Sequence, residues 1–402
     1  MIEDAVQPDP ANTRPDTDTS SSPETDTPSS LHSEPGPSPA TPRLTAEGDE
    51  APAELTGRAV AAGRNLSFGF NLAKVPGQGE DSDPIRREGR ELGLVGVFDG
   101  MGGAGGTVYE TPDGPRSGAY LASRVARDVV EHRMLELLDP EWNLDGPATA
   151  RDLQRSVKQA LADRLSELNA PPSGLRSRLL RALPTTMAVI ALQRREPGGD
   201  VWDCHLFWAG DSRAYVFEPA SGAHQLTIDD IRSGGDAMTN LREDSVVSNA
   251  MSADTDFAVH HHKVQLTAPF LVAAATDGCF GYLPTPMHFE YLVLAALRDS
   301  TDSDGWSRAV QSAIAQVTGD DASMSLLAVG ADHARLKELF ADRTAQLERG
   351  CITRLDQLQS DVQRAERQLH ELGQRQQQLR AQMWAEYKSG YEQYLASTRG
   401  AS

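Results

Sequence analysis

The chain has 402 residues, of which 39% are hydrophobic, and it carries a formal net charge of −20 at pH 7. This length accommodates one large domain of about 200 to 250 residues with extensions, or two ordinary domains. A surface of that sign is repelled by phosphate backbones, which argues against a nucleic-acid binder. No apolar stretch is long enough to cross a bilayer, so we expect no membrane partner.

The cysteines point to the cellular compartment. Cys204, Cys279 and Cys351 are far apart and odd in number. This pattern fits a reducing cytosol better than a disulfide framework. The N-terminus also lacks the basic and apolar regions of a signal peptide. We therefore expect a cytoplasmic protein.

The composition changes twice along the chain. Residues 1–58 are rich in Pro, Ser, Thr, Asp and Glu, so they bury too little apolar surface to offset chain entropy and are predicted to be disordered. Residues 59–331 have the pattern of a folded domain. Residues 332–402 are predicted to form a helical or coiled-coil extension.

Within the folded part, short apolar runs predict strands and apolar residues at helical spacing predict helices. In chain order, strands are expected at 65–73, 91–98, 185–193, 201–210, 213–219, 257–266, 270–276 and 323–330. Helices are expected at about 116–138, 150–168, 287–297 and 305–317. Helices grouped between runs of adjacent strands indicate an α+β fold with antiparallel sheets.

The C-terminal extension carries a heptad seam. Its apolar residues alternate three and four apart, with Gln376 as the single polar exception. They are Leu355, Leu358, Val362, Ala365, Leu369, Leu372, Leu379 and Met383. A coiled coil or a long helical hairpin would have this pattern, and we favour a homo-oligomer over a helix that folds back on its own domain. Gly373 weakens the helix by about 1 kcal/mol relative to Ala.

Four aspartates stand at the ends of apolar runs. Asp99, Asp211 and Asp277 each follow such a run, and Asp320 precedes another. A single aspartate there is more often a turn former or a helix cap than a ligand. Several carboxylates brought together repel unless cations lie between them, and hard oxygen ligands favour Mg²⁺ or Mn²⁺. The combination predicts a metal-dependent enzyme.

Five segments then identify a family. They are FDGMGG (98–103), PTTMAVIAL (184–192), GDSRAYVF (210–217), ATDG (275–278) and GDDASMSLL (319–327). Their order and content resemble the signature segments of type 2C, metal-dependent serine/threonine protein phosphatases, over about residues 62–330. The resemblance implies two antiparallel sheets packed as a sandwich and flanked by helices, with a binuclear Mn²⁺ or Mg²⁺ centre at one end.

The resemblance also implies roles for individual residues. Asp99 resembles the carboxylate that bridges both metals, and the Gly100 carbonyl resembles a further ligand. Asp277 and Asp320 resemble the ligands that complete the first metal site. These three aspartates are the predicted catalytic residues. Asp320 is preferred to Asp321, because the family places this ligand three residues before a Ser or Thr, but the adjacency leaves the choice open.

Further acidic residues match the second and third metal positions. Glu80 and Asp81 resemble the pair that reaches the second metal through water, and Asp211 matches the residue that serves a weak third metal in some members. Two such ions can supply a hydroxide from a bridging water for in-line attack on a phosphoserine or phosphothreonine ester. No protein nucleophile is then needed. Cys279 has no adjoining basic residue to lower its pKa and is predicted to be a core thiol.

The chain departs from the family at several positions. The family usually has an Arg five residues before the acidic Asp81, where a guanidinium clamps the substrate phosphate, but this chain has Pro76. Lys74 is the predicted substitute as a phosphate-binding residue. Met101 stands where many members have a His that protonates the leaving group, and Gly281 stands where relatives often have an acidic residue. These departures motivate an alternative, a pseudophosphatase that serves as a phosphoprotein-binding or regulatory module.

Two other interpretations are weaker. Gly100, Gly102 and Gly105 fit the spacing of a dinucleotide fingerprint, but Asp99 would place a negative charge beside the pyrophosphate. Three consecutive histidines, residues 260–262, cannot converge on one ion, because neighbours on a strand point to alternate faces.

The resemblance implies partners as well: a phosphoprotein substrate and a cognate Ser/Thr kinase. The polar segment from about 228 to 258 lies where relatives carry a flap beside the active site, and we expect it to influence substrate choice.

Overall fold

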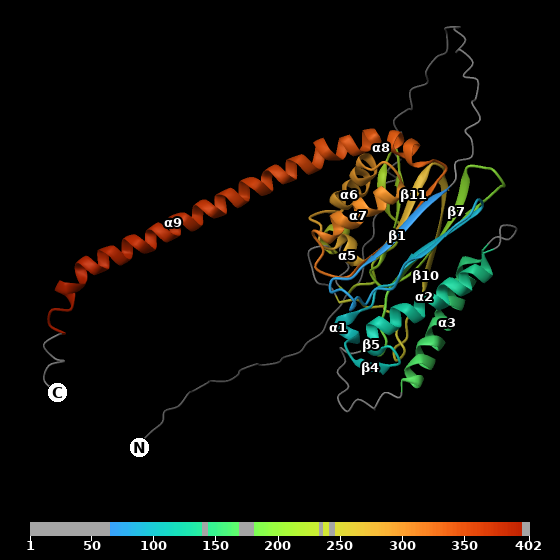
Figure 1. The fold of residues 1–402 in the computed structure, drawn as a ribbon, viewed down its shortest axis with the longest axis horizontal. Coiled ribbons are helices and arrows are strands. Elements are labelled where there is room, and N and C mark those ends of the chain that lie inside the picture. Colours follow the sequence, from blue (N-terminus) through green and yellow to red (C-terminus); the bar gives the residue numbers. More distant parts are fainter. Residues whose placement is uncertain (1–64, 139–143, 169–180, 233–235, 241–245, 396–402) are drawn as a thin grey trace, which may run out of the picture. The chain divides into compact units, whose positions relative to one another are not determined.

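A computed structural model describes residues 65–138, 144–168, 181–232, 236–240 and 246–395 (Figure 1). The predicted disordered tail, residues 1–58, lies outside the described residues. Among the residues described, no helix is long and apolar enough to cross a membrane.

Two five-stranded antiparallel sheets form the centre of the fold (Figure 1). The first has the order β1 (Leu66–Leu72), β12 (Ala322–Val329), β11 (Phe270–Ala275), β8 (Arg213–Glu218) and β9 (Gly222–Gln225). The second has the order β10 (His260–Thr267), β7 (Val201–Ala209), β6 (Met187–Arg194), β3 (Leu92–Val97) and β2 (Ile85–Glu88). A separate hairpin joins β4 (Val108–Thr111) and β5 (Gly114–Ser117). The predicted fold class and each of the eight predicted strands are confirmed.

Helices cover the outer face of each sheet. α6 (Pro286–Asp299), α7 (Ser303–Ala315) and α8 (His333–Leu347) share a core with the first sheet. α2 (Gly118–Leu137) and α3 (Gly146–Glu167) share a core with the second. Three short helices lie in connections: α1 (Gly102–Gly105), α4 (Ala237–Asn240) and α5 (Asp277–Phe280).

Because helices cover both sheets, the central strands are apolar on both faces. In β11, Phe270 and Val272 point into the core between the two sheets. Leu271 and Ala273, one residue along in each case, point into the core beneath the helices. The period of two along a strand therefore divides one apolar run between two cores.

The helix starts follow from local capping. Ser117 accepts a hydrogen bond from the backbone N–H of Tyr120 and begins α2, two residues after the predicted start. Asp145 accepts one from Ala148 and begins α3 four residues before the predicted start. Both are side-chain N-caps, which satisfy N–H groups that a first helical turn leaves unpaired.

The C-terminal extension divides into a buried and an exposed part. α8 packs Leu336, Phe340 and Leu347 into the core of the first sheet, so the folded core continues past the predicted boundary at residue 331. A π-helical turn, Glu348–Ile352, leads into α9 (Thr353–Tyr391), a single continuous helix with no buried residue. The predicted long helix is confirmed, and the structure describes one helix rather than a helical hairpin.

Candidate functional site

The predicted acidic residues lie at one end of the two sheets. Asp99, Asp211 and Asp277 each lie two residues beyond the end of a strand, of β3, β7 and β11 respectively. Asp320 precedes β12, whose first residues pair with the last residues of β11, as Met324 lies opposite Ala275. Antiparallel register therefore brings the start of one strand beside the end of its neighbour.

The backbone around Asp99 is held by the neighbouring strand. The Asp99 carbonyl accepts hydrogen bonds from the Thr186 N–H at 2.9 Å and from the Thr185 hydroxyl at 2.5 Å. The next residue, Gly100, lies so close to the loop before β2 that a Cβ there would come within 2.5 Å of the Glu80 carbonyl oxygen. Only glycine permits this approach, which explains why the Asp-Gly pair is needed here.

A second Asp-Gly pair makes the same kind of contact on the other sheet. A Cβ on Gly278 would overlap the backbone carbonyl of Asp321. Asp277 is thereby held beside the segment that carries Asp320. Thr276 completes the contact, because its hydroxyl donates to the Asp81 carboxylate at 2.9 Å and accepts from the Ser323 N–H at 2.8 Å.

The carboxyls interact strongly with one another. Burial raises the pKa of Asp99 well above its ordinary range, and the nearby charges of Asp277, Asp81, Asp211 and Asp320 raise it further. Burial is likewise the largest cause of the raised pKa values of Asp81, Asp211 and Asp277. Hydrogen bonds with the Asp99 carboxyl act in the opposite direction on Asp81 and Asp277. Such a set of groups takes up protons unless a cation neutralises it.

Glu80 belongs to the edge of this cluster. Its pKa is raised by burial and by the charges of Asp321 and Asp320, while a 2.5 Å hydrogen bond from the Ser117 hydroxyl lowers it. The structure thus brings together Glu80, Asp81, Asp99, Asp211, Asp277 and Asp320. We call these six residues the acidic cluster.

The acidic cluster has suitable ligand atoms for metal ions, but its side chains are not arranged around an ion. Its donors are carboxylate oxygens, the ligands that Mg²⁺ and Mn²⁺ prefer. In the part of the chain that the structure describes, however, no three His, Cys, Asp or Glu side chains are already closed around a point where an ion could sit. Metal binding would therefore require these side chains to turn toward the ion, and the charge that the ion neutralises favours that movement.

Asp320 and Asp321 make different contacts. The two Asp321 carboxylate oxygens accept hydrogen bonds from the backbone N–H groups of Lys74, at 2.8 Å, and Glu80, at 2.6 Å. The Asp320 carboxylate accepts a hydrogen bond from the Asp321 N–H at 2.9 Å. Asp321 thus fixes the loop before β2, and its charge adds to the burial that raises the pKa values of Glu80 and Asp81. The charge of exposed Asp320 adds in the same way to the raised pKa values of Asp99 and Asp277. The Asp320 carboxylate therefore has fewer backbone hydrogen-bond partners than the Asp321 carboxylate.

Lys74 contributes mainly through its backbone. Its N–H is bonded to Asp321, and its side chain is exposed. Two arginines that the sequence analysis overlooked lie against the same loop. Arg124 donates to the Gly79 and Glu80 carbonyls at 3.2 and 3.1 Å.

The Arg116 guanidinium has hydrogen-bond donors that the described residues do not use. One of its terminal nitrogens donates to the Gly77 carbonyl at 3.2 Å, and its guanidinium lies 4.6 Å from the centre of the Tyr120 ring. Its Nε is buried without a partner in the described structure. Because Arg116 immediately precedes Ser117, which holds Glu80, it is a candidate for contact with a phosphate at the acidic cluster.

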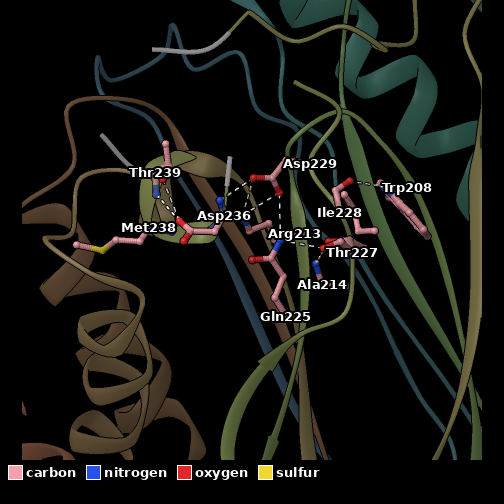
Figure 2. Close-up of polar contacts among 10 residues, drawn as sticks. All are labelled: Trp208, Arg213, Ala214, Gln225, Thr227, Ile228, Asp229, Asp236, Met238 and Thr239. Atoms are coloured by element: carbon pink, nitrogen blue, oxygen red, sulfur yellow. Dashed lines mark hydrogen bonds and ion pairs between the residues drawn. The ribbon is translucent and has the colours of Figure 1, made fainter. Parts of the chain in front are cut away.

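The segment expected to form a flap is partly described and is tied to Asp211. The Asp230 carboxylate accepts the N–H of Gly210, just before Asp211, at 3.0 Å. Its neighbour Asp229 forms a buried 2.7 Å ion pair with Arg213 (Figure 2). The beginning of this segment is therefore anchored beside the acidic cluster.

Other candidate residues prove to be structural. The histidines of β10 do not converge: His260 contacts Asp230, whereas His261 contacts His205 on β7. Cys279 is buried, its thiol donates to the Ser323 carbonyl at 3.2 Å, and burial raises its pKa well above the ordinary range. The prediction of a core thiol is confirmed.

These features define an α+β protein in which two antiparallel sheets form a sandwich and the acidic cluster lies at one end of the sheets. No family model and no curated protein matches the chain. Solved structures with similar folds include the serine/threonine phosphatase PstP/Ppp of Mycobacterium tuberculosis, at 17% identity over 67% of this chain and 100% of that one, with a TM-score of 0.47. PppA of Pseudomonas aeruginosa is 15% identical over 67% and 99%, with a TM-score of 0.44. A sex-determining protein of C. elegans is 16% identical over 69% and 68%, with a TM-score of 0.49.

Proposed function

We propose that this protein is a metal-dependent phosphatase that hydrolyses phosphoserine and phosphothreonine in cytoplasmic phosphoproteins, opposing a Ser/Thr kinase. The observation that carries the proposal is the acidic cluster. Carboxylates from segments more than 200 residues apart meet at one end of the sheets. There, in addition to burial, the charges of Asp277, Asp81, Asp211 and Asp320 raise the pKa of Asp99. Such an arrangement is costly unless it binds cations.

Asp99, Asp277 and Asp320, with the Gly100 carbonyl, would hold one ion. Glu80 and Asp81 would reach a second ion through water, and Asp211 would serve a third ion that binds more weakly. When bound, Mn²⁺ or Mg²⁺ would lower the pKa of water and offset charge on the phosphoryl oxygens.

The remaining tasks belong to this chain's own residues. Thr276 keeps the buried Asp81 carboxylate oriented, because its hydroxyl is itself fixed by the Ser323 N–H. Ser117 does the same for Glu80. Arg116, with Lys74 at the exposed edge of the loop, would bind the phosphoryl oxygens and position the ester. An Arg guanidinium suits this task because its donors match a phosphate in two places.

The test measures hydrolysis of a phosphothreonine peptide by the full-length protein with manganese and with chelator. We expect turnover only with the metal, and its loss in Asp99→Asn and Asp277→Asn. Asp203→Asn is the matched control, because Asp203 is a buried aspartate at the other end of β7, paired with Lys263. Equal activity in chelator would contradict the proposal.

A pseudophosphatase is the second candidate. The absence of a preformed metal cage among the described residues and the proline at position 76 favour it. It predicts binding of the phosphothreonine peptide without turnover in any metal, so the same experiment separates the two functions.

A further inference from the structure

α9 presents a long apolar face that the described chain leaves uncovered. None of its 39 residues is buried. Leu358, Val362, Leu369, Leu372, Leu379 and Met383 are each 55–71% exposed. They occupy the alternating three- and four-residue spacing of a coiled-coil seam, whereas isolated surface apolar residues show no such period.

Packing against a partner would stabilise this helix. Helices in proteins owe most of their stability to packing of an apolar face, and Gly373 and Gly390 each cost about 1 kcal/mol relative to Ala. One apolar residue every three or four positions forms a narrow stripe along the helix. Such a stripe packs better against a second helix with the same pattern than against the flat surface of a sheet. We propose that α9 pairs with α9 of a second copy of this chain, and that the two helices run antiparallel.

Flanking charges set the direction. With Leu355 at heptad position a, the charged residues of positions e and g are acidic in the first half of the seam, at Asp361 and Glu366, and basic in the second half, at Arg375 and Arg380. A parallel pair in register would place Asp361 beside the partner's Glu366 and Arg375 beside the partner's Arg380. Both contacts are repulsive. An antiparallel pair places the acidic half of each helix beside the basic half of the other.

The sizes of the seam residues agree. In a parallel pair the polar Gln376 would face the partner's Gln376, and small Ala365 would face the partner's Ala365, which leaves a gap. In an antiparallel pair centred between Leu369 and Leu372, Gln376 faces the partner's Ala365, so a large side chain meets a small one. Leu369 then packs against the partner's Leu372.

Distances between spin labels decide the orientation. In full-length protein with Cys351→Ser, the remaining Cys204 and Cys279 are buried, so a label introduced at Lys388→Cys is the single accessible one. Lys388 lies about 17 residues from the centre of the seam, so antiparallel helices separate the two labels by about 50 Å at 1.5 Å per residue. Parallel helices would hold them about 20 Å apart. A monomeric mass in solution, or a dimer with the short distance, would overturn the proposal.

Salt and charge reversal supply an independent check. Attractive flanking pairs make the dimer dissociate more readily as salt rises, whereas repulsive pairs have the opposite salt dependence. Arg375→Glu with Arg380→Glu should weaken the dimer about tenfold or more. Arg364→Glu with Arg367→Glu makes the same charge change at positions c and f, outside the seam, and should leave the dissociation constant within about twofold. None of these measurements depends on phosphatase activity.

Discussion

Replacing Asp277 by Asn should make the metal-free protein more stable while abolishing its response to metal. Burial and the Asp320 charge raise the pKa of Asp277 from 3.8 to about 6. At 1.36 kcal/mol per pKa unit, ionising this carboxyl in the folded state costs up to about 3 kcal/mol at pH 7.5. The backbone N–H of Gly278 donates a hydrogen bond that favours the ionised Asp277 carboxylate. An Asn side chain would accept this hydrogen bond less strongly, which offsets part of the gain. A net gain of about 1–2 kcal/mol is therefore expected.

The pH dependence follows from the sign of this change. A carboxyl whose folded pKa is raised contributes stability below its unfolded pKa, and loses it as pH rises through the folded value. In chelator, the wild type and Asp277→Asn should therefore differ at pH 7.5 and converge near pH 4. The gain corresponds to a rise in Tm of about 2–8 °C at pH 7.5.

Metal should reverse the order of stability of the wild type and Asp277→Asn. A ligand at 100 times its dissociation constant stabilises the folded state by about 2.7 kcal/mol, which raises Tm by about 5–11 °C in the wild type. Asp277→Asn should show little of this shift. Differential scanning calorimetry in chelator and in manganese measures both effects. A variant that is less stable than the wild type in chelator, or that still gains the full manganese shift, would contradict this prediction.

Three further outcomes are expected. Arg116→Ala should raise KM for a phosphopeptide about tenfold and weaken inhibition by inorganic phosphate, with little change in kcat, whereas Arg86→Ala, an exposed arginine on β2, should change neither. Asp229→Asn should lower the free energy of unfolding by about 3–5 kcal/mol in urea titrations, because it leaves the buried Arg213 charge unpaired. Burial lowers the pKa of His205 from 6.5 to about 4. As pH drops, His205 therefore binds a proton in the unfolded chain before it does so in the folded protein, and the free energy of unfolding should fall between about pH 6.5 and 4. His205→Gln should flatten that part of the urea-derived curve, and an unchanged slope would assign it to other groups.

The sequence predicted the central strands because both of their faces are buried, which makes them nearly continuous apolar runs. β2 (Ile85–Glu88) was missed because it is an edge strand with one buried residue, Ile85, and three exposed ones. The β4–β5 hairpin was not predicted, although its Asp113-Gly114 pair is a turn signal that could have revealed it. Short or half-exposed elements carry too few apolar residues for periodicity to detect.

The site was predictable where its chemistry is concentrated in motifs. The aspartates at strand ends could be found because apolar runs mark those ends. Arg116 and Arg124 could not, since they meet the Gly77–Glu80 loop only after the chain has folded back across about 40 residues. No sequence spacing predicts that residues near the start of α2 will contact the loop before β2. A resemblance likewise pointed to an absent Arg before Asp81 but not to a guanidinium supplied by another element.

The paired aspartates at 320 and 321 show why acidic residues next to one another need not share a role. Both Asp321 carboxylate oxygens accept hydrogen bonds from backbone N–H groups of the loop that carries Glu80. The charge of Asp321 also adds to the burial that raises the pKa values of Glu80 and Asp81. Asp320 accepts a single backbone hydrogen bond from within its own turn, and its charge acts on Asp99 and Asp277. A metal ion competes more easily for the carboxylate with fewer partners, because it displaces fewer hydrogen bonds. In the proposed function, the loop before β2 would therefore stay fixed while a cation binds at Asp320 and dissociates from it.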